Sequence, residues 1–324
     1  MDAVLMPGTA FFEAMRAAGR QVKGQWDLAD VIILAPMVLA PGVSLRMQIT
    51  VGAESGGART VHVYSAPESD EDGEWQLHAE GKLVPAQAAR QDSVELPPPD
   101  GDPIDVTALY QDLHELGYGY GPTFQGINAA WHVDGDVWAR VALPEAAASS
   151  AIRYGLHPAL LDSSMHSLLL TQRLKAQVGD DVFVPFEAER LSVWKDGLAE
   201  VWVKVAEFEL GEGEFWASLD LYDTSGEHVG RLQRLHARRI DRGRQQAIAK
   251  QVQLAAPPQP QRRTRGPVAA PAGAPPPPRG AAAPGGGRGR PLPVPHRMAA
   301  GRGTRGRVRR HLGPAGRRRR ALGR

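Results

Sequence analysis

Residues 154–170 read "YGLHPALLDSSMHSLLL", an apolar stretch that predicts a mostly buried helix. Two ionisable residues, Asp162 and His166, interrupt the run of leucines. They are four residues apart, a spacing that places both side chains on one face of a helix. A polar pair in such surroundings is either a hydrogen-bonded link to a neighbouring element or a site for chemistry, because buried polar groups need partners.

The helix predicted over residues 157–175 begins a pattern that also occurs in the first half of the chain. Residues 7–22 ("PGTAFFEAMRAAGRQV") predict a helix with Pro7 in its first turn. After each helix the sequence predicts four strands, within residues 29–84 in the first half and within residues 182–240 in the second. Strands that alternate apolar and polar residues bury one face, and a helix can cover that face. The sequence therefore predicts an α+β fold made of two copies of a sheet wrapped around a central helix.

The composition excludes several classes of protein. The chain has 324 residues, enough for two ordinary domains, and no cysteine, which excludes disulfides and cysteine-based metal sites or nucleophiles. Its apolar runs fall short of the roughly 20 residues that a membrane-spanning helix needs. Its first residues lack the basic start of a signal peptide. We therefore expect a cytoplasmic protein without a membrane partner.

Charge divides the chain into two chemically different parts. Residues 242–324 hold 20 of the 38 Lys and Arg and no Asp or Glu, so residues 1–241 carry 18 basic and 36 acidic side chains, a net charge of −18. Residues 243–324 are rich in Pro, Gly, Ala and Arg and contain no aromatic residue. Such a segment buries too little apolar surface to fold, and we expect a disordered tail.

Three interpretations of the tail remain open. It could bind nucleic acid through its charge, it could be a linker, or it could be the product of a frameshift in a GC-rich gene. We favour the frameshift and regard nucleic acid as the weakest of the three. The expected domains are a first half over 1–88, a polar, Pro-rich linker over 89–105, a second half over 106–242 and the tail over 243–324.

Four motifs in this order resemble one known family: "LMPGTAFFEAM" (5–15), "WQLHAEGKLV" (75–84), "GYGYGPTFQGI" (117–127) and "LHPALLDSSMHSLLL" (156–170). Together they make residues 1–241 similar to the dehydratase domain of modular (type I) polyketide synthases, enzymes of secondary-metabolite and antibiotic biosynthesis. The resemblance implies a double hotdog fold, in agreement with the two helix-and-sheet copies.

The resemblance also implies an activity. The family removes water from a β-hydroxyacyl chain held on the phosphopantetheine arm of acyl carrier protein, and the product is an α,β-unsaturated thioester. No metal or redox cofactor takes part. Acyl carrier protein, the neighbouring synthase domains and a second copy in a homodimer are the implied partners. A base must take the α-proton while an acid protonates the departing hydroxyl; in the family these are a His of the first hotdog and an Asp on the helix of the second.

Carried onto this sequence, the resemblance assigns Asp162 as the general acid and His166 as the residue that orients that acid or holds the substrate hydroxyl. It also implies that six further residues shape the substrate tunnel: Tyr118, Tyr120, Gly121, Pro122, Pro7 and Gly8. The alternative for the pair is a structural hydrogen bond, and the alternative for the Gly-Pro corner is an ordinary turn.

The match departs from the family at the general base. The family pattern is His-x-x-x-Gly-x-x-x-x-Pro, in which Pro7 would be the last member; Asp2 stands at the Gly position and the His would precede residue 1. We therefore expect a truncated first hotdog and a fragment that is inactive alone. His62, His78 and His157 are expected to be structural.

Three alternative functions stay open from sequence. The first is a non-catalytic scaffold with the same fold. The second is a relative with changed chemistry, such as a cyclase, an isomerase or a thioesterase. The third, and the weakest, is a nucleic-acid binder that acts through its tail.

Overall fold

The computed structural model describes residues 4–40, 42–69, 73–90, 92–98, 100–171 and 182–240. The chain divides into two units, residues 1–261 and residues 262–324, and every described residue lies in the first unit. The disorder predicted for residues 243–324 lies outside the described residues, as does the end of the second predicted helix.

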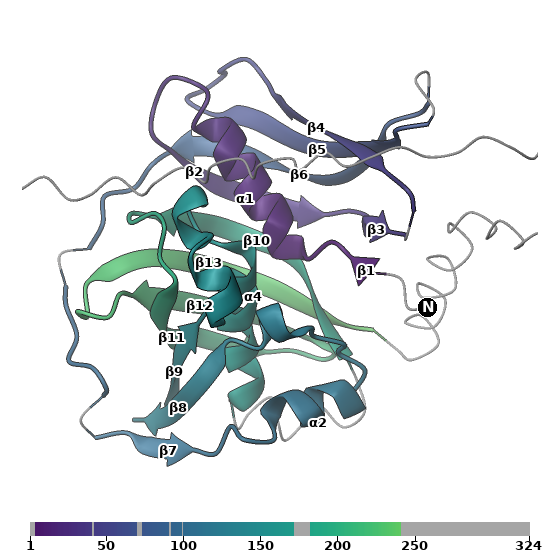
Figure 1. The fold of residues 1–324 in the computed structure, drawn as a ribbon. Helices are drawn as coiled ribbons and strands as arrows, with labels where there is room; N and C mark the ends of the chain where they lie inside the picture. The colour runs from purple at the N-terminus through teal and green to yellow at the C-terminus, as the bar shows by residue number, and fades with distance from the viewer. Residues whose placement is uncertain are drawn as a thin grey trace, which may run out of the picture. The chain divides into compact units, whose positions relative to one another are not determined.

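The first half is a sheet packed on one helix (Figure 1). Its elements are α1 (Gly8–Gly19), β2 (Trp26–Ile33), β4 (Leu45–Val51), β5 (Arg59–Pro67) and β6 (Gln76–Pro85), with a strand order of β4-β5-β6-β2. Two short strands, β1 (Val4–Leu5) and β3 (Val38–Leu39), pair separately. Phe11, Phe12 and Met15 of α1 are fully buried among the apolar residues of these strands. The helical spacing of these three residues is what makes α1 the core of this half.

The second half repeats this arrangement around α4 (Pro158–His166), which a 3-10 turn, η3 (Ser167–Leu170), continues. Its strands are β7 (Asp102–Ile104), β8 (Ile127–Val133), β9 (Asp136–Ala142), β10 (Val182–Val193), β11 (Glu200–Leu210), β12 (Glu214–Tyr222) and β13 (His228–Ile240). They follow the order β10-β13-β12-β11-β9-β8-β7. The short helices are α2 (Leu109–Glu115), η1 (Pro122–Phe124), α3 (Glu145–Ala148) and η2 (Ala151–Arg153).

A single seam joins the two halves. Strand β2 pairs antiparallel with β10, with Leu28 opposite Leu191, so the described strands form one 11-stranded sheet apart from β1 and β3. Asp27 is buried at this seam and accepts hydrogen bonds from Ser192 Oγ at 2.6 Å and Arg190 Nη1 at 3.1 Å. Helices α1 and α4 also contact each other across the seam. This architecture confirms the α+β double hotdog fold.

Two of the differences between the observed elements and the sequence predictions lie in the second half. The helix predicted over residues 157–175 is an α-helix only as far as His166 and continues as a 3-10 turn. The hairpin of β8 and β9 was not predicted at all. Its turn contains Asp134 and Gly135, with φ of 50° and 87°, and an Asp-Gly pair between apolar runs is a strong signal for such a hairpin.

The segment predicted as a linker contains ordered structure. Residues 93–96, which we name the strap, run against the β12–β13 turn: Ser93 pairs with Glu227, and Val94 N donates to Gly226 O at 3.0 Å. Val94 and Leu96 cover an aromatic cluster separate from the main core, made of Trp138, Trp202 and Tyr222 with Trp131 beside them. The strap is therefore packed on the second sheet, and the domain limits at residues 88 and 106 stay predictions.

Within the described ranges, each helix is too short or too polar to cross a lipid bilayer.

The strap contact can be tested at Gly226. This residue has φ of +84°, and a Cβ added there would lie 2.0 Å from Val94 O. Gly135 has nearly the same φ, +87°, but no heavy atom within 4 Å of its added Cβ. Both Gly→Ala changes carry the left-handed backbone cost of about 1–2 kcal/mol. We expect the free energy of unfolding of Gly226→Ala to fall by a further ~1–3 kcal/mol, because the new methyl group displaces the strap.

The measurement is the free energy of unfolding in urea, followed by tryptophan fluorescence, for the full chain and both variants. Equal losses for Gly226→Ala and Gly135→Ala would show that the strap contributes nothing to stability.

Candidate active site

Asp162 lies on α4 at the place where the two helices meet. It is 9% exposed, and its Oδ1 accepts a hydrogen bond from Oγ1 of Thr9, a buried residue in the first turn of α1, at 3.5 Å. Its Oδ2 lies 3.3 Å from Nε2 of His166. The carboxylate is therefore contacted from both halves of the chain, as a residue at their shared site should be.

His166 is 3% exposed, and three side chains surround its ring. Its Nδ1 lies 3.4 Å from the hydroxyl of Tyr110 on α2. The ring of Tyr120 lies against it, with centroids 4.1 Å apart. Although Nε2 is close to Asp162, it has no hydrogen-bond partner with acceptable geometry and no solvent contact. The proximity and the missing hydrogen bond are compatible, because two atoms 3.3 Å apart without alignment of donor and acceptor are in contact but not hydrogen-bonded.

The loop before β8 supplies the aromatic wall of this site. Tyr118 stacks on Tyr120 with ring centroids 5.7 Å apart, and its hydroxyl donates to Phe183 O at 2.9 Å and accepts from Phe183 N at 2.8 Å. Gly121 and Pro122 begin the turn η1. Both tyrosines predicted for the tunnel thus belong to the cluster around His166, whereas Gly121 and Pro122 shape the exposed turn beside it.

Ser163 fixes this loop to α4. Its Oγ donates to Phe124 O at 3.0 Å and accepts from Gly126 N at 3.2 Å. A Cβ added to Gly126 would lie 2.8 Å from that hydroxyl oxygen, so the close approach requires glycine. Ser163 and Asp162 are neighbours in sequence, and the same helical turn therefore carries the carboxylate and the anchor for the aromatic loop.

Burial keeps the tyrosines of the site protonated. It raises the pKa of Tyr110 to about 12 and that of Tyr118 to about 12. Burial also raises the pKa of Tyr120, and the negative charge of Asp162 raises it further. Each phenol therefore stays a hydrogen-bond donor across the neutral range, because desolvation disfavours the phenolate.

Pro7 and Gly8 set the start of α1. Pro7 is extended and precedes the helix, and Ala10 N donates to its carbonyl oxygen at 3.0 Å. A Cβ added to Gly8 would lie 2.6 Å from Cδ1 of Ile33. These two residues position Thr9, which reaches Asp162, rather than touching Asp162 themselves in any hydrogen bond of the described chain.

The sequence analysis missed Glu13, which anchors the start of α4. This carboxylate of α1 is 6% exposed and accepts hydrogen bonds from Gly155 N at 2.8 Å and Leu156 N at 3.2 Å. Arg16 and Arg20 pair with it at 3.2 Å and 2.7 Å. The two amides lie just before α4, so Glu13 holds the helix that carries Asp162 against the helix that carries Thr9.

The three histidines that the sequence analysis expected to be structural make contacts away from Asp162. His78 binds Ser65 Oγ at 2.7 Å and Ala35 O at 3.2 Å, and burial lowers its pKa. His157 accepts from Ala159 N at 3.1 Å as the cap of α4, and its pKa is also lowered by burial. The ring of His62 packs beside Tyr64. Each therefore has a structural contact.

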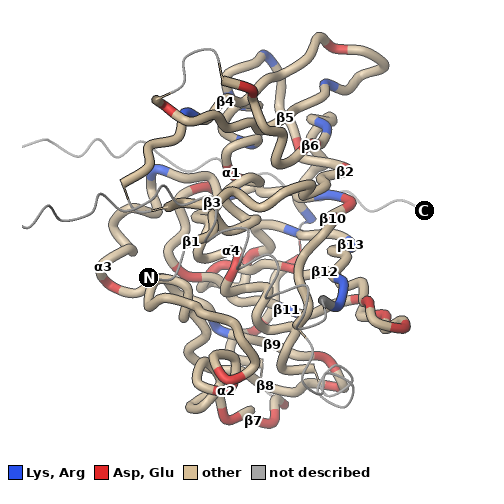
Figure 2. Tube along the Cα trace, turned by 90° about the vertical axis from the view of Figure 1, so that its right-hand side faces the viewer, with Lys and Arg blue, Asp and Glu red and all other residues tan. Residues whose placement is uncertain are grey.

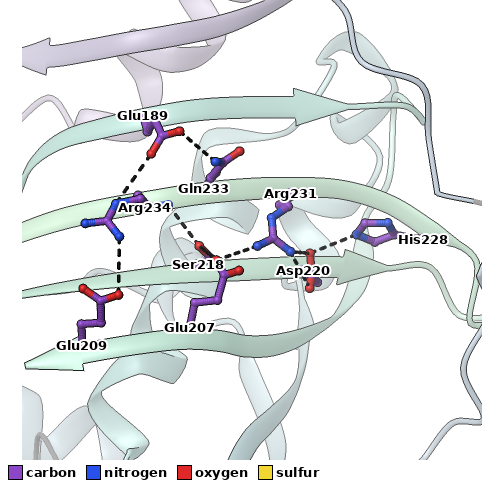
Figure 3. Close-up of polar contacts among 9 residues, drawn as sticks. All are labelled: Glu189, Glu207, Glu209, Ser218, Asp220, His228, Arg231, Gln233 and Arg234. Carbon is purple, nitrogen blue, oxygen red and sulfur yellow. Dashed lines mark hydrogen bonds and ion pairs between the residues drawn. The ribbon is translucent and has the colours of Figure 1, made fainter.

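A second polar network lies across strands β10, β13, β12 and β11 (Figure 3). Asp220 pairs with Arg231 at 2.8 Å and with the buried His228 at 3.2 Å, and Ser218 Oγ donates to Glu207 at 2.7 Å. Glu207 and Arg234 have φ of 54° and 44° and occupy the irregular positions of β11 and β13. These contacts link the register shifts of neighbouring strand pairs, and we assign the network a structural role.

Metal sites and cavities away from Asp162 are the other candidates among the described residues. No group of three or more His, Asp or Glu in the described part of the chain could hold a metal ion. A cavity of about 390 Å³ lies near the β8–β9 turn, lined by residues such as His132, Asp136 and Phe208, away from the Asp162 cluster. Figure 2 shows acidic residues around α2, β7 and β8, consistent with the net negative charge of residues 1–241.

Two family profiles match the chain. Residues 88–247 match the family described as polyketide synthase dehydratase N-terminal domain, and residues 1–66 match the one described as polyketide synthase dehydratase domain. A curated relative, the phenolphthiocerol synthesis polyketide synthase type I Pks15/1 of Mycobacterium bovis, is 35% identical over 225 residues. These residues are 69% of this chain and 10% of that synthase, so the chain spans a small part of its relative's length.

Solved structures agree with these matches. The bifunctional dehydratase-cyclase domain in ambruticin biosynthesis is 33% identical, with a TM-score of 0.65 over 74% of this chain and 84% of that one. The dehydratase domain from the CurK module of the curacin polyketide synthase is 26% identical, with a TM-score of 0.64 over 75% of this chain and 85% of that one. Two inactive mutants of the CurK dehydratase are also similar, one with asparagine in place of an aspartate and one with phenylalanine in place of a histidine.

The anchoring role of Glu13 predicts a large loss of stability for Glu13→Gln. The change leaves two buried amides and two arginines with a neutral partner, and breaking a buried ion pair costs about 3–5 kcal/mol. Asp30→Asn is the matched control, because Asp30 pairs with Lys82 at 2.9 Å on the surface. An exposed pair contributes about 1 kcal/mol or less. Unfolding in urea measures both; similar losses would mean that Glu13 anchors nothing.

Proposed function

The chain belongs to the dehydratase-domain family of polyketide synthases, and we propose that it supplies the general acid for dehydration of a β-hydroxyacyl thioester. One observation carries this proposal: Asp162 is a buried carboxyl at the junction of α1 and α4, in contact with Thr9 of one half and His166 of the other. The CurK dehydratase, a relative by fold and sequence, loses activity in a mutant in which an aspartate becomes asparagine.

The reaction requires the carboxyl of Asp162 to carry a proton when substrate binds. A base removes the α-proton, its electron pair forms the α,β double bond, and the bond from the β-carbon to the hydroxyl oxygen breaks. Asp162 gives its proton to that oxygen, which leaves as water. The base now holds the α-proton, and exchange with solvent returns both groups to their starting states. General acid–base catalysis of this kind contributes roughly 10²–10⁴-fold to a rate.

The surroundings of Asp162 suit this role. Thr9 and His166 touch its two oxygens, which fixes the carboxyl in one orientation. The rings of Tyr120 and His166 form one wall beside it. Enclosure by these groups keeps bulk water from competing for the proton, because water-exposed donors lose selectivity for the substrate oxygen.

The proposed reaction also needs a general base that is separate from Asp162. His62, His78 and His157 make no hydrogen bond or ring contact with Asp162 or His166 within the described chain. We therefore propose that the base is a histidine of the first hotdog supplied by the intact synthase polypeptide, and that the 324-residue chain alone does not dehydrate substrate.

The family relationship suggests the remaining partners. Homologues of this chain are domains of modular synthases, which makes neighbouring polyketide synthase domains its partners. We propose that acyl carrier protein presents the acyl chain on its phosphopantetheine arm, that no other cofactor is bound, and that the domain works as a homodimer in the cytoplasm. Because one relative is a dehydratase-cyclase, ring closure is the second candidate reaction.

Asp162→Asn tests the acid. In the intact synthase polypeptide, we expect this variant to lose about 10²–10⁴-fold in the rate of enoyl thioester formation while its unfolding transition stays cooperative. The substrate is a 3-hydroxyacyl thioester of a short pantetheine mimic, and mass spectrometry measures the loss of one water. Asp112→Asn, on the exposed side of α2, is the isosteric control and should retain the parental rate. Retained dehydration in Asp162→Asn would remove Asp162 from the mechanism.

The origin of the base is tested by comparing two proteins. The 324-residue chain should give no enoyl thioester above the uncatalysed background, whereas the intact synthase polypeptide, here called the extended chain, should give the enoyl product. Turnover by the shorter chain would mean that a histidine within it is the base. A cyclic product from the extended chain would favour the cyclase, and no product from either would favour a scaffold.

A further inference from the structure

Tyr110 is a partly buried tyrosine of α2 that the sequence motifs did not single out. Its hydroxyl lies between the backbone before β8 and the ring of His166: it accepts from Ile127 N at 2.9 Å and lies 3.4 Å from Nδ1 of His166. The two rings meet edge to face, with centroids 5.8 Å apart. The distance to Nδ1 is at the long end of the hydrogen-bond range, and such contacts commonly tighten when substrate binds.

The donor and acceptor roles around this hydroxyl follow from what each group can do. A phenol has one proton to donate. The amide of Ile127 is a donor, so the proton of Tyr110 is free to point elsewhere. Two acceptors lie within reach, Nδ1 of His166 and the hydroxyl of Ser163. Ser163 already donates to Phe124 O and accepts from Gly126 N, whereas Nδ1 of His166 has Tyr110 as its partner.

The choice of acceptor decides the tautomer of His166. In neutral imidazole one ring nitrogen accepts and the other carries the proton. If Nδ1 accepts from Tyr110, the proton is on Nε2, the nitrogen that faces Asp162 at 3.3 Å. That N–H is buried and has no aligned acceptor in the described chain. A buried donor without a partner is costly, about 1–3 kcal/mol, unless a ligand provides the acceptor.

We propose that Tyr110 is a positioning residue that holds His166 as the Nε2–H tautomer, so that this N–H binds the β-hydroxyl oxygen of the substrate beside Asp162. The inference deepens the proposed function and rests on it for the identity of the substrate. The raised pKa of Tyr110, about 12, keeps its proton available for Nδ1. Tyr110 acts through His166 and has no contact with the reacting atoms of its own.

Nitrogen-15 NMR of the full chain, at a pH where the imidazole is neutral, tests the tautomer without any need for catalysis. The signals of His166 are assigned by their absence in His166→Gln. We expect a protonated Nε2 and an unprotonated Nδ1. In Tyr110→Phe, the same signals should move toward the Nδ1–H form or a mixture of the two forms, because the hydrogen bond that selects the tautomer is gone.

Tyr118→Phe is the matched control. Tyr118 is a partly buried member of the same aromatic cluster. Its hydroxyl makes two hydrogen bonds to Phe183 and none to His166 in the described chain. We expect its removal to weaken the fold but to leave the His166 tautomer as in the parent. An Nδ1–H tautomer in the parent overturns the inference, even if Tyr110→Phe does not fold. An unchanged tautomer in Tyr110→Phe, or an equal change in both variants, also overturns it.

Kinetics separate positioning from catalysis. In the intact synthase polypeptide, Tyr110→Phe should lower kcat about tenfold with an unchanged KM, because the N–H of His166 is used at the leaving hydroxyl. An unchanged kcat would overturn the inference. If Asp162→Asn retains dehydration, the dehydratase proposal fails, but the NMR result on the His166 tautomer still stands. Failure of the proposed function and failure of the inference about Tyr110 can therefore be told apart.

Discussion

The buried carboxylate of Glu13 is the interaction on which the geometry of the site depends. It is on α1, yet it accepts two backbone hydrogen bonds from Gly155 and Leu156 immediately before α4. A charged group this well buried is stable only because Arg16 and Arg20 neutralise it and both oxygens have donors. These contacts help to fix the position of α1 relative to α4. Thr9 and Asp162, which lie on those helices, are in hydrogen-bond contact.

The pairing of β2 with β10, which joins the two halves of the sheet, provides the second constraint. Asp27 binds Ser192 and Arg190 across the β2–β10 pairing, and Leu28 faces Leu191. Glu13 therefore fixes the helices, and Asp27 fixes the strands around them. Because the acid of the proposed mechanism is touched from both halves, its orientation is a property of the whole double hotdog and not of α4 alone.

The sequence was sufficient for elements whose signal is local. The alternation of residues 182–240 predicted four strands where β10 to β13 lie, and the apolar face of 7–22 predicted α1. The sequence also singled out Asp162 and His166, because a polar pair at helical spacing within an apolar run can be recognised without a structure. The packing of the strap was not predicted, because the prolines and acidic residues around it are typical of a linker and its contact with the aromatic cluster is not visible in the sequence.

The residues that sequence could not find are those whose roles depend on distant partners. Glu13 lies 142 positions from Gly155, and Tyr110 lies 56 positions from His166. No local pattern distinguishes them from an ordinary helical glutamate or a core tyrosine. Yet they determine where the acid stands and which nitrogen of its neighbour carries a proton. The buried N–H that this leaves beside Asp162 has no acceptor of its own in the described chain. A substrate oxygen beside Asp162 would supply that acceptor, because buried donors generally have a hydrogen-bond partner.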